Sequence, residues 1–305
     1  MSREYEVVII GGGPAGLSAG IYTARARLSS LLVEKGIVGG LVTNAEVVEN
    51  YPGFPEGISG LELTELMHKQ ATKFGLETLT AEVTGVELEG KQKIVKTSEG
   101  NLTTKALIAA GGSDRVQLNV PGEKEFTGKG VSYCAICDAS FFSEQTVAVI
   151  GGGNSAVYEA LQLAKFASKV IVIHRRDELR ATRIVQEKAF AEPKIELLWN
   201  NIVERIEGEG VVKRLRLHNV VTGDESTLDV SGVFVSIGFK PNTDYLRGIL
   251  PLDAAGYIVV NEKMETGIPG IFAAGDIRSG SIRQVVAAAG DGATAAIYAE
   301  RFIAQ

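Results

Sequence analysis

The chain has 305 residues, of which 45% are hydrophobic and 22% charged, and its formal net charge is −6. These values are typical of a globular protein of about two domains, since a domain holds roughly 150 residues. The negative charge argues against nucleic-acid binding, which usually depends on a basic surface.

No apolar run reaches the roughly 18 residues that a membrane-spanning helix needs. Residues 1–6 are polar and carry no signal-peptide pattern. The chain has only two cysteines, which fits thiols that cycle better than a framework of structural disulfides. We therefore expect a cytoplasmic protein that does not enter a membrane.

The first predicted element is a buried strand over residues 5–10, followed by the glycine-rich turn 11–16 and a helix over 17–27. This order is the context of a G-x-G-x-x-G dinucleotide site, where the glycines let a pyrophosphate reach the helix N-terminus. A second strand over 30–33 ends at Glu34, where a carboxylate is placed to hydrogen-bond a ribose diol. The opening stretch therefore predicts a dinucleotide-binding fold.

Residues 36–55 are too rich in glycine and proline for regular structure. They are either a surface connection or a functional loop, and their length favours the loop because long unstructured connections are uncommon in compact domains. Apolar spacing predicts a helix over 61–74. Residues 76–109 alternate as short β-segments and end in an apolar run.

Both cysteines lie in the motif of residues 133–138, as Cys134 and Cys137, next to Asp138. This spacing brings two thiols close enough to form or break a disulfide, and such motifs lower a thiol pKa. Two other interpretations are half of a zinc site, although the chain's histidines are widely scattered, and a pair of buried core cysteines.

The opening pattern recurs at residue 146, with a strand over 146–150, the turn 151–156 in its G-x-G-x-x-A form, and a helix over 157–166. The offset from Gly11 to Gly151 is 140 residues, and the same offset takes Glu34 to His174. Basic residues thus replace the ribose-binding acid. Arginine can bind a 2′-phosphate that a carboxylate would repel, so we predict NADP(H) in the second fold. A solvated strand end is the alternative explanation of Arg175 and Arg176.

The rest of the chain predicts a helix over 180–190, β-segments over 195–237 and a linker over 239–243. A further buried strand over 270–276 ends in Gly-Asp, at the carboxyl edge where ligands bind open α/β sheets. A long, alanine-rich helix over 281–302 completes the predicted elements.

In combination, these motifs resemble the low-molecular-weight, NADPH-dependent thioredoxin reductases, which are flavoproteins with two dinucleotide-binding domains. The resemblance covers essentially the whole chain, and it is carried by residues 11–16, 49–55, 134–138, 151–156, 174–177 with Arg180, and 273–276 with 283–284.

The resemblance implies an α/β protein with two Rossmann-like domains of the three-layer ββα type. The FAD domain is discontinuous and comprises residues 1–114 and 244–305. The NADPH domain comprises residues 115–243 and carries the redox Cys-x-x-Cys. A homodimer is also implied, and no metal.

The family's cofactor contacts are carried over by position. The expected FAD-binding residues are Gly11, Gly13, Pro14, Ala15, Gly16, Glu34, Lys35, Gly40, Leu41, Asn50, Gly111, Gly275, Asp276, Arg283, Gln284 and Val285. The expected NADPH-binding residues are Gly151, Gly153, Asn154, Ser155, His174, Arg175, Arg176 and Arg180. Three positions depart from the common pattern of the family, namely Leu41, Ala139 and Asn154.

The implied reaction passes electrons from NADPH through FAD to the Cys134–Cys137 disulfide, and then to the disulfide of thioredoxin or a thioredoxin-like protein. Cys137 takes the flavin-proximal role. Asp138 acts as the general acid if burial raises its pKa, and the alternative is an N-cap for the following turn.

Three rival functions remain open. They are a flavin-dependent dithiol oxidase or NADPH-independent disulfide reductase of the same fold, a ferredoxin-NADP reductase, and a flavin-bound redox sensor without enzymatic activity.

Overall fold

The computed structural model describes residues 3–45 and 47–305, and the chain divides into two compact units. Unit 1 comprises Met1–Asp114 and Lys240–Gln305, and unit 2 comprises Arg115–Phe239. The chain passes between them along β7 (Ser113–Arg115) and β16 (Phe239–Pro241), which pair with each other. The second junction lies within β16, between Phe239 and Lys240, whereas the sequence-based prediction placed the boundary after residue 243.

The sheet of unit 1 has the strand order β3-β2-β1-β6-β5-β4, and β17 pairs with β6. Its parallel strands are β1 (Arg3–Ile10), β2 (Ser30–Glu34), β3 (Glu77–Thr80), β6 (Gly100–Ala109) and β17 (Ile271–Ala273). The strands β4 (Val83–Glu89) and β5 (Gln92–Thr97) run antiparallel. β6 therefore joins the two parts, since its first half pairs with β5 and its second half with β17.

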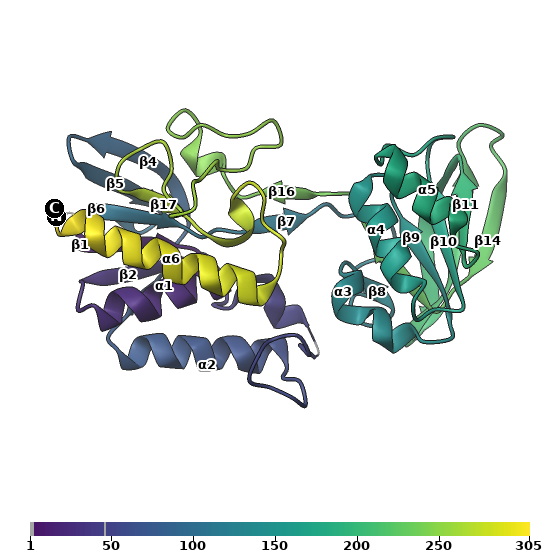
Figure 1. Ribbon diagram of the computed structural model, residues 1–305, viewed down its shortest axis with the longest axis horizontal. Coiled ribbons are helices and arrows are strands. Elements are labelled where there is room, and N and C mark those ends of the chain that lie inside the picture. Colours follow the sequence, from purple (N-terminus) through teal and green to yellow (C-terminus); the bar gives the residue numbers. More distant parts are fainter. Residues whose placement is uncertain (1–2, 46) are drawn as a thin grey trace. The chain divides into compact units, whose positions relative to one another are not determined.

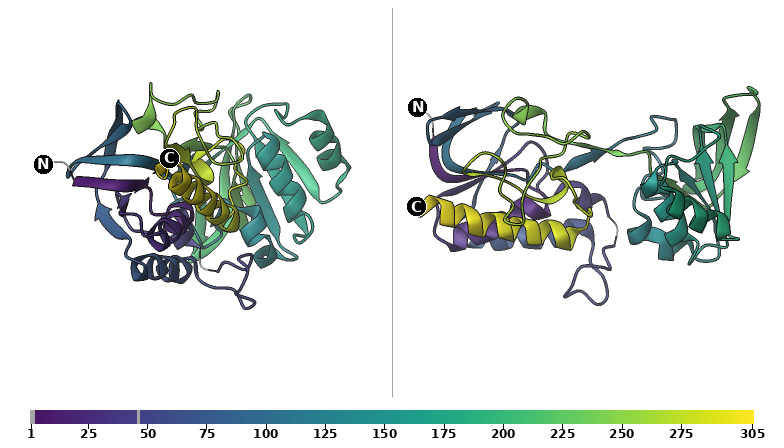
Figure 2. Two further views of the ribbon diagram at one scale, coloured as in Figure 1. Left: turned by 60° about the vertical axis from the view of Figure 1, so that its left-hand side comes forward. Right: turned by 45° about the horizontal axis from the view of Figure 1, so that its top comes forward.

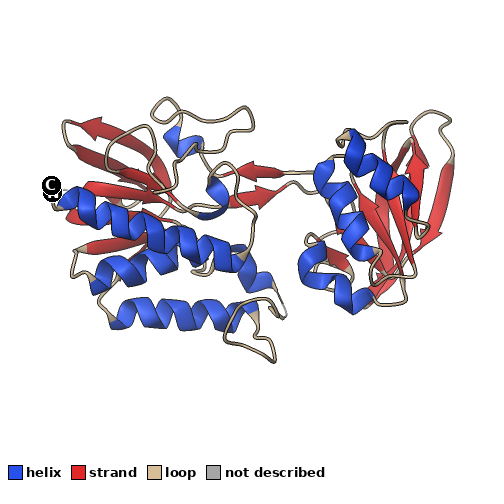
Figure 3. Cartoon of the chain, in the orientation of Figure 1, coloured by secondary structure: helices blue, strands red, loops and turns tan. Residues whose placement is uncertain are grey.

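Three long helices, α1 (Pro14–Arg25), α2 (Gly60–Lys73) and α6 (Val285–Ile303), lie on one side of this sheet (Figures 1 and 3). Val7 and Ile9 pack in the same cluster as these helices, whereas Val8 and Ile10 pack with β4 and β5 on the other face. β1 is thus buried on both faces, which explains why its sequence is a continuous apolar run rather than an alternation.

Unit 2 repeats this layering. Its parallel sheet has the order β11-β10-β9-β15-β8, formed by Ile195–Trp199, Lys169–His174, Thr146–Ile150, Gly232–Val235 and Val131–Ser132. The helices α4 (Asn154–Leu163) and α5 (Arg183–Ala191) cover one face (Figure 2). An antiparallel sheet of β12 (Asn201–Glu209), β13 (Val211–Asn219) and β14 (Glu225–Asp229) covers the other. The predicted α/β fold with two Rossmann-like units of three layers is confirmed.

The internal repeat is visible in the backbone hydrogen bonds. The Gly11 amide donates to Val33 O (2.8 Å), and the Gly151 amide donates to Ile173 O (3.1 Å). Each bond ties a glycine turn to the strand that follows its helix, at the same 140-residue offset. The predicted correspondence of the two folds is therefore confirmed at the level of single bonds.

Several element boundaries differ from the sequence-based ones. α1 begins at Pro14, because proline suits the first position of a helix. α6 begins at Val285 rather than residue 281, since Arg283 has φ +56°, which no right-handed helix accommodates. The loop over 36–55 contains the 3₁₀ turn η1 (Gly40–Asn44).

The remaining short elements are α3 (Ala135–Asp138), η2 (Ala139–Phe142), η3 (Asp244–Leu246) and η4 (Gly275–Ile277). Among residues 3–45 and 47–305, we find no helix whose length and apolar character would let it cross a bilayer.

The core of unit 2 yields a stability prediction. Phe234 in β15 is fully buried, and its ring meets that of Phe142 edge-on at 5.3 Å. Phe234→Ala should lower the free energy of unfolding by about 3–5 kcal/mol, because it removes buried contacts and leaves a cavity. Urea unfolding followed by circular dichroism measures the change. Phe190, at the end of α5, is 58% exposed and provides the control. Equal effects of Phe234→Ala and Phe190→Ala would contradict this account of the core.

Candidate functional site

The first glycine turn leaves the N-terminus of α1 open to a ligand. Gly13 occupies the N-cap and Pro14, which has no N–H, is the first residue of α1, so no side chain caps the amides that follow. Gly11 has φ +106°, and a Cβ there would lie 2.4 Å from Ala110 O. A Cβ on Gly16 would lie 1.9 Å from Gly11 O. The turn therefore requires glycine at these positions, and its open backbone fits a pyrophosphate.

Glu34 lies beside this turn at the end of β2. Its Oε2 accepts from the Gly12 amide (2.7 Å) and its Oε1 accepts from the Gly36 amide (2.9 Å). Two backbone amides thus hold the carboxylate at the carboxyl edge of the sheet. Glu34 is partly exposed, and its bond to a ribose hydroxyl remains a prediction.

Other predicted FAD residues gather around the same turn from distant parts of the chain. Gly111 lies against Gly11, and a Cβ on Gly40 would lie 3.0 Å from the Gly13 Cα. A Cβ on Gly275 would lie 2.9 Å from the Ala15 Cβ. These close backbone approaches form a cradle that larger residues would fill, and they fit the dinucleotide that the sequence predicts.

The N-terminus of α6 contributes a further part of this site. Asn50 in the long loop donates to Gln284 Oε1 (3.0 Å), which links two predicted FAD residues separated by 234 positions. Arg283 donates to the Tyr257 hydroxyl (3.1 Å). Val285, another predicted FAD residue, is the first residue of α6. Of the other predicted residues, Lys35 directly precedes the loop over 36–55 and Leu41 lies within it, and both are exposed. The loop over 36–55 is thus connected to the predicted site.

Asp276 is the acidic residue at the end of β17. Its Oδ1 accepts from the Ser281 hydroxyl (2.8 Å). Burial raises the pKa of the Asp276 carboxyl, and the hydrogen bond from Ser281 partly offsets this. The carboxyl is therefore held in one orientation at the carboxyl edge of the unit 1 sheet.

The second glycine turn is built on His174. The His174 side chain is 5% exposed, and a Cβ on Gly152 would lie 2.3 Å from its ring. The imidazole thus packs directly under the turn. Burial lowers the pKa of His174, and the positive charges of the neighbouring arginines lower it further, so the ring is neutral at pH 7.

The arginines that follow His174 face solvent. Arg175 and Arg176 are exposed at the end of β10, and Arg180 is exposed a few residues later. The Arg180 amide donates to Gly152 O (2.7 Å), which joins the basic segment to the glycine turn. These positions fit a dinucleotide with a 2′-phosphate, because three exposed arginines follow His174, the residue that corresponds to Glu34 in the first fold.

Asn154 and Ser155 begin α4 and were both predicted to contact NADPH. Asn154 Oδ1 accepts from the Thr182 amide (2.8 Å), which fastens the start of α5 to the start of α4. Ser155 is exposed in the first turn of α4. The structure therefore shows an additional, structural use of Asn154.

Cys134 and Cys137 form a disulfide with a Cα–Cα distance of 5.3 Å, within the usual range. Cys134 precedes α3, and its carbonyl accepts from the amides of Cys137 (3.2 Å) and Asp138 (3.1 Å). Both cysteines are partly exposed, so the interpretation as buried core cysteines is wrong. The described residues contain no cluster of three or more His, Cys, Asp or Glu side chains that could hold a metal ion.

Asp138 is held in place by Ser132, a residue that the sequence analysis missed. The Ser132 hydroxyl donates to Asp138 Oδ2 (2.5 Å) and accepts from the Cys134 amide (3.1 Å). Asp138 occupies the N-cap position of η2, as the alternative interpretation expected, but its side chain makes no capping hydrogen bond there. In the sequence, the signal for this role of Ser132 is that a hydroxyl residue lies two positions before the first cysteine.

Burial raises the pKa of the Asp138 carboxyl, and the hydrogen bond from Ser132 and the positive charge of Arg115 partly offset this. Burial also raises the pKa of Glu159, in α4, to about 7, again against the charge of Arg115. The Arg115 guanidinium lies 4.9 Å from the centre of the Tyr133 ring. The redox motif therefore has a carboxyl group that retains its proton more readily than an exposed one.

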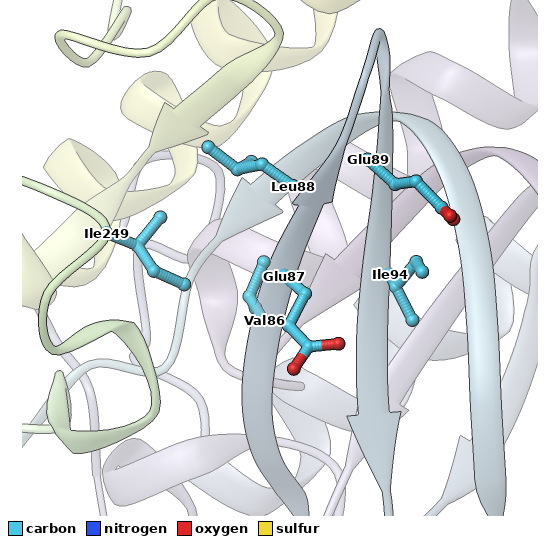
Figure 4. Close-up of a pocket in the computed structure, with 6 residues that line it drawn as sticks. All are labelled: Val86, Glu87, Leu88, Glu89, Ile94 and Ile249. Atoms are coloured by element: carbon cyan, nitrogen blue, oxygen red, sulfur yellow. The ribbon is translucent and has the colours of Figure 1, made fainter.

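A pocket of about 430 Å³ lies elsewhere in unit 1, between β4, β5 and the loop that carries Ile249 (Figure 4). Its lining residues are Val86, Glu87, Leu88, Glu89, Ile94 and Ile249. None of them is a predicted site residue, and the Glu87 carboxylate pairs with Lys96. This pocket is therefore separate from the candidate site.

Residues 5–292 match the family model of the pyridine nucleotide-disulphide oxidoreductases. The chain is 47% identical to a thioredoxin reductase of Bacillus subtilis (strain 168), over 99% of this chain and 96% of that protein. It is 45% identical to one of Peptoclostridium acidaminophilum, over 99% and 98%. The crystal structure of thioredoxin reductase from Streptococcus pyogenes MGAS5005 is 41% identical, with a TM-score of 0.95 and coverage of 100% and 99%.

The bond from Ser132 to Asp138 yields a prediction. Ser132→Ala removes a donor to the ionised carboxylate, so the pKa of Asp138 should rise further above its ordinary value. Titration of the carboxyl carbon by NMR, in protein with ¹³C-labelled aspartate, measures the shift. Ser140 is exposed in η2, and Ser140→Ala should leave the titration unchanged. An unchanged Asp138 titration in Ser132→Ala would show that this bond does not set the pKa.

Proposed function

This chain belongs to the pyridine nucleotide-disulphide oxidoreductase family, and we propose that it acts as a thioredoxin-disulfide reductase that uses NADPH and FAD. Its full-length similarity to thioredoxin reductases supports this activity. The resemblance predicted from the motifs is confirmed by the same matches. The observation that carries the proposal is the Cys134–Cys137 disulfide beside Asp138, in a chain with two dinucleotide folds.

Unit 1 binds FAD in this proposal. The turn over residues 11–16 holds the pyrophosphate at the N-terminus of α1, and Glu34 accepts from the adenosine ribose. Gly40, Gly111 and Gly275 let the backbone approach the cofactor closely. In this proposal the remaining residues of the predicted FAD set complete the site, among them Asn50, which donates to Gln284 just before α6.

Unit 2 binds NADPH. Its turn over residues 151–156 holds the pyrophosphate, and Arg175, Arg176 and Arg180 bind the 2′-phosphate through charge-assisted hydrogen bonds. His174 supports the turn from below as a neutral ring. The contrast between Glu34 in one fold and basic residues in the other supports the assignment of the two cofactors.

FAD held by unit 1 would supply the two electrons that reduce the disulfide, and NADPH held by unit 2 would be their source. Those electrons break the bond between Cys134 and Cys137, and two protons are needed to yield two thiols. Asp138 donates one of these protons to the Cys137 thiolate, because burial keeps its carboxyl protonated more readily than in water. Ser132 orients that carboxyl.

Transfer to the partner is a thiol–disulfide exchange. The Cys134 thiolate attacks a sulfur of the thioredoxin disulfide, so that a mixed disulfide forms and one thioredoxin thiolate leaves. Cys137 then attacks Cys134, which restores the Cys134–Cys137 disulfide and releases the second thioredoxin thiolate. The net change is the reduction of one partner disulfide by two electrons and two protons.

The alternative is a dithiol oxidase or a disulfide reductase of the same fold that does not use NADPH. It is not favoured, because such a protein has no need of Arg175, Arg176 and Arg180 around the second glycine turn. The homodimer and the cytoplasmic location stay predictions, and light scattering of the purified protein tests the first.

Anaerobic titration tests the proposal. NADPH should bleach the flavin absorbance of the purified protein, and a thiol assay should then detect Cys134 and Cys137 as free thiols. Cys137→Ser should keep bound FAD and reduce artificial electron acceptors, yet lose thioredoxin reduction because it cannot complete the exchange. A flavin that NADPH leaves oxidised, or thioredoxin reduction that survives in Cys137→Ser, would overturn the assignment.

The arginines should set the preference for NADPH over NADH. Replacing Arg175 and Arg176 together by alanine should lower kcat/KM for NADPH by about 100-fold or more, since each charge-assisted bond contributes on the order of 1.5–3 kcal/mol. The value for NADH should change little. Arg214, on β13 and paired with Asp229, provides a control in the same unit. An equal loss with both nucleotides would contradict phosphate recognition by these residues.

A further inference from the structure

Asp291 is an acidic residue in the middle of the alanine-rich helix α6, and its side chain is buried. A buried carboxylate is costly unless it is paired and hydrogen-bonded. Arg278 supplies the pairing in a bidentate arrangement, with Nε donating to Asp291 Oδ2 (2.6 Å) and Nη2 donating to Oδ1 (3.0 Å). The Gly275 amide also donates to Oδ2 (3.1 Å). One carboxylate thus holds a side chain and a backbone amide.

The two partners of Asp291 lie at opposite ends of a short segment. Gly275 begins η4 and Arg278 directly follows it, so both ends of the segment 275–278 are fastened to α6. Arg278 Nη1 also donates to Ser279 O (3.2 Å), which gives the guanidinium a third hydrogen bond beside the two to Asp291. Between the two ends lies Asp276, a predicted FAD residue. The orientation of Asp276 therefore depends on the bonds to Asp291.

The same segment packs against the first glycine turn. A Cβ on Gly275 would lie 2.9 Å from the Ala15 Cβ, and a Cβ on Gly292 would lie 2.0 Å from Ala15 O. η4 and α6 therefore both contact Ala15, in the first turn of α1. Asp291 directly precedes Gly292, so the ion pair lies where η4, α6 and α1 meet. In the proposed function, the N-terminus of α1 at this point binds the pyrophosphate.

The charges of Arg278 and Asp291 affect this junction in addition to their hydrogen bonds. The guanidinium of Arg278 neutralises Asp291 close to Asp276, whose other neighbours are Ser281 and Arg283. Without Arg278, Asp291 would be an unpaired carboxylate close to Asp276, and its charge would act on the predicted site of an anionic cofactor. Without Asp291, the Gly275 amide would lose its acceptor and the segment would be free to shift.

We propose that Arg278 and Asp291 are positioning residues that determine the affinity of unit 1 for FAD, by holding the segment 275–278 against the first turn of α1. Neither side chain has to touch the cofactor. The inference rests on the proposed binding of FAD by unit 1, and it adds two residues that lie outside the predicted cofactor contacts.

The test compares the affinities of apoprotein variants for FAD, measured by the quenching of flavin fluorescence during titration. Asp291→Asn keeps the shape of the side chain but loses the charge, and Arg278→Lys keeps the charge but loses the bidentate geometry. Each should weaken FAD binding by at least about tenfold, since each loses a charge-assisted hydrogen bond that holds the segment 275–278. Arg247, paired with Asp244 on the surface of unit 1, supplies the control Arg247→Lys, which should bind as the unchanged protein does.

A double variant separates positioning from simple stabilisation of the fold. Arg278→Met with Asp291→Leu replaces the ion pair by apolar side chains, a change that often preserves stability. It still leaves the Gly275 amide without its acceptor, so its FAD affinity should remain about tenfold weaker even where its thermal unfolding matches that of the unchanged apoprotein. Recovery of the original affinity by this double variant would overturn the proposal.

Two further outcomes are informative. If the unchanged apoprotein binds FAD and both single variants bind it with the same affinity, the positioning role is wrong while the proposed function stands. If the unchanged apoprotein binds no FAD, the proposed function itself is wrong and the inference falls with it.

Discussion

Close backbone packing at the two glycine turns is the constraint on which the rest of the structure depends. A methyl group on Gly11 would lie 2.4 Å from Ala110 O, and one on Gly151 would lie 2.3 Å from Ser236 O. Each contact joins a turn to the chain that leaves the adjacent strand of the sheet. Since no side chain intervenes, the strands end at the same level and the helix N-terminus opens at that edge, where α/β sheets bind their ligands.

The two folds fill the position behind this turn with different chemistry. In unit 1 the Glu34 carboxylate lies against Gly12, and in unit 2 the His174 ring lies against Gly152, at equivalent positions of the repeat. The histidine provides the packing without a negative charge, and it leaves Arg175 and Arg176 to emerge into solvent at the end of β10. The same backbone can thus accept either a free ribose diol or a 2′-phosphate.

The redox motif meets two opposite requirements. A disulfide that reacts with another protein must be accessible, whereas an acid that protonates a thiolate needs enough burial to retain its proton. The motif follows β8, a short strand at the edge of the unit 2 sheet, which leaves both cysteines partly exposed. Asp138 is desolvated enough for its pKa to be raised, and Ser132 at the end of β8 connects its carboxylate to the Cys134 amide.

The sequence by itself determined the repeated strand, turn and helix units, the glycine positions and the redox pair, because these depend on local conformation and on short-range spacing. It also located the change from Glu34 to His174 and the arginines, since that comparison needs only the register of the repeat. Only the tertiary structure decided that Ser132 holds Asp138, that α6 begins at Val285, and that Asp291 pairs with Arg278. These features depend on which groups become buried together and on the backbone conformation at Arg283, and contacts between separate elements determine both.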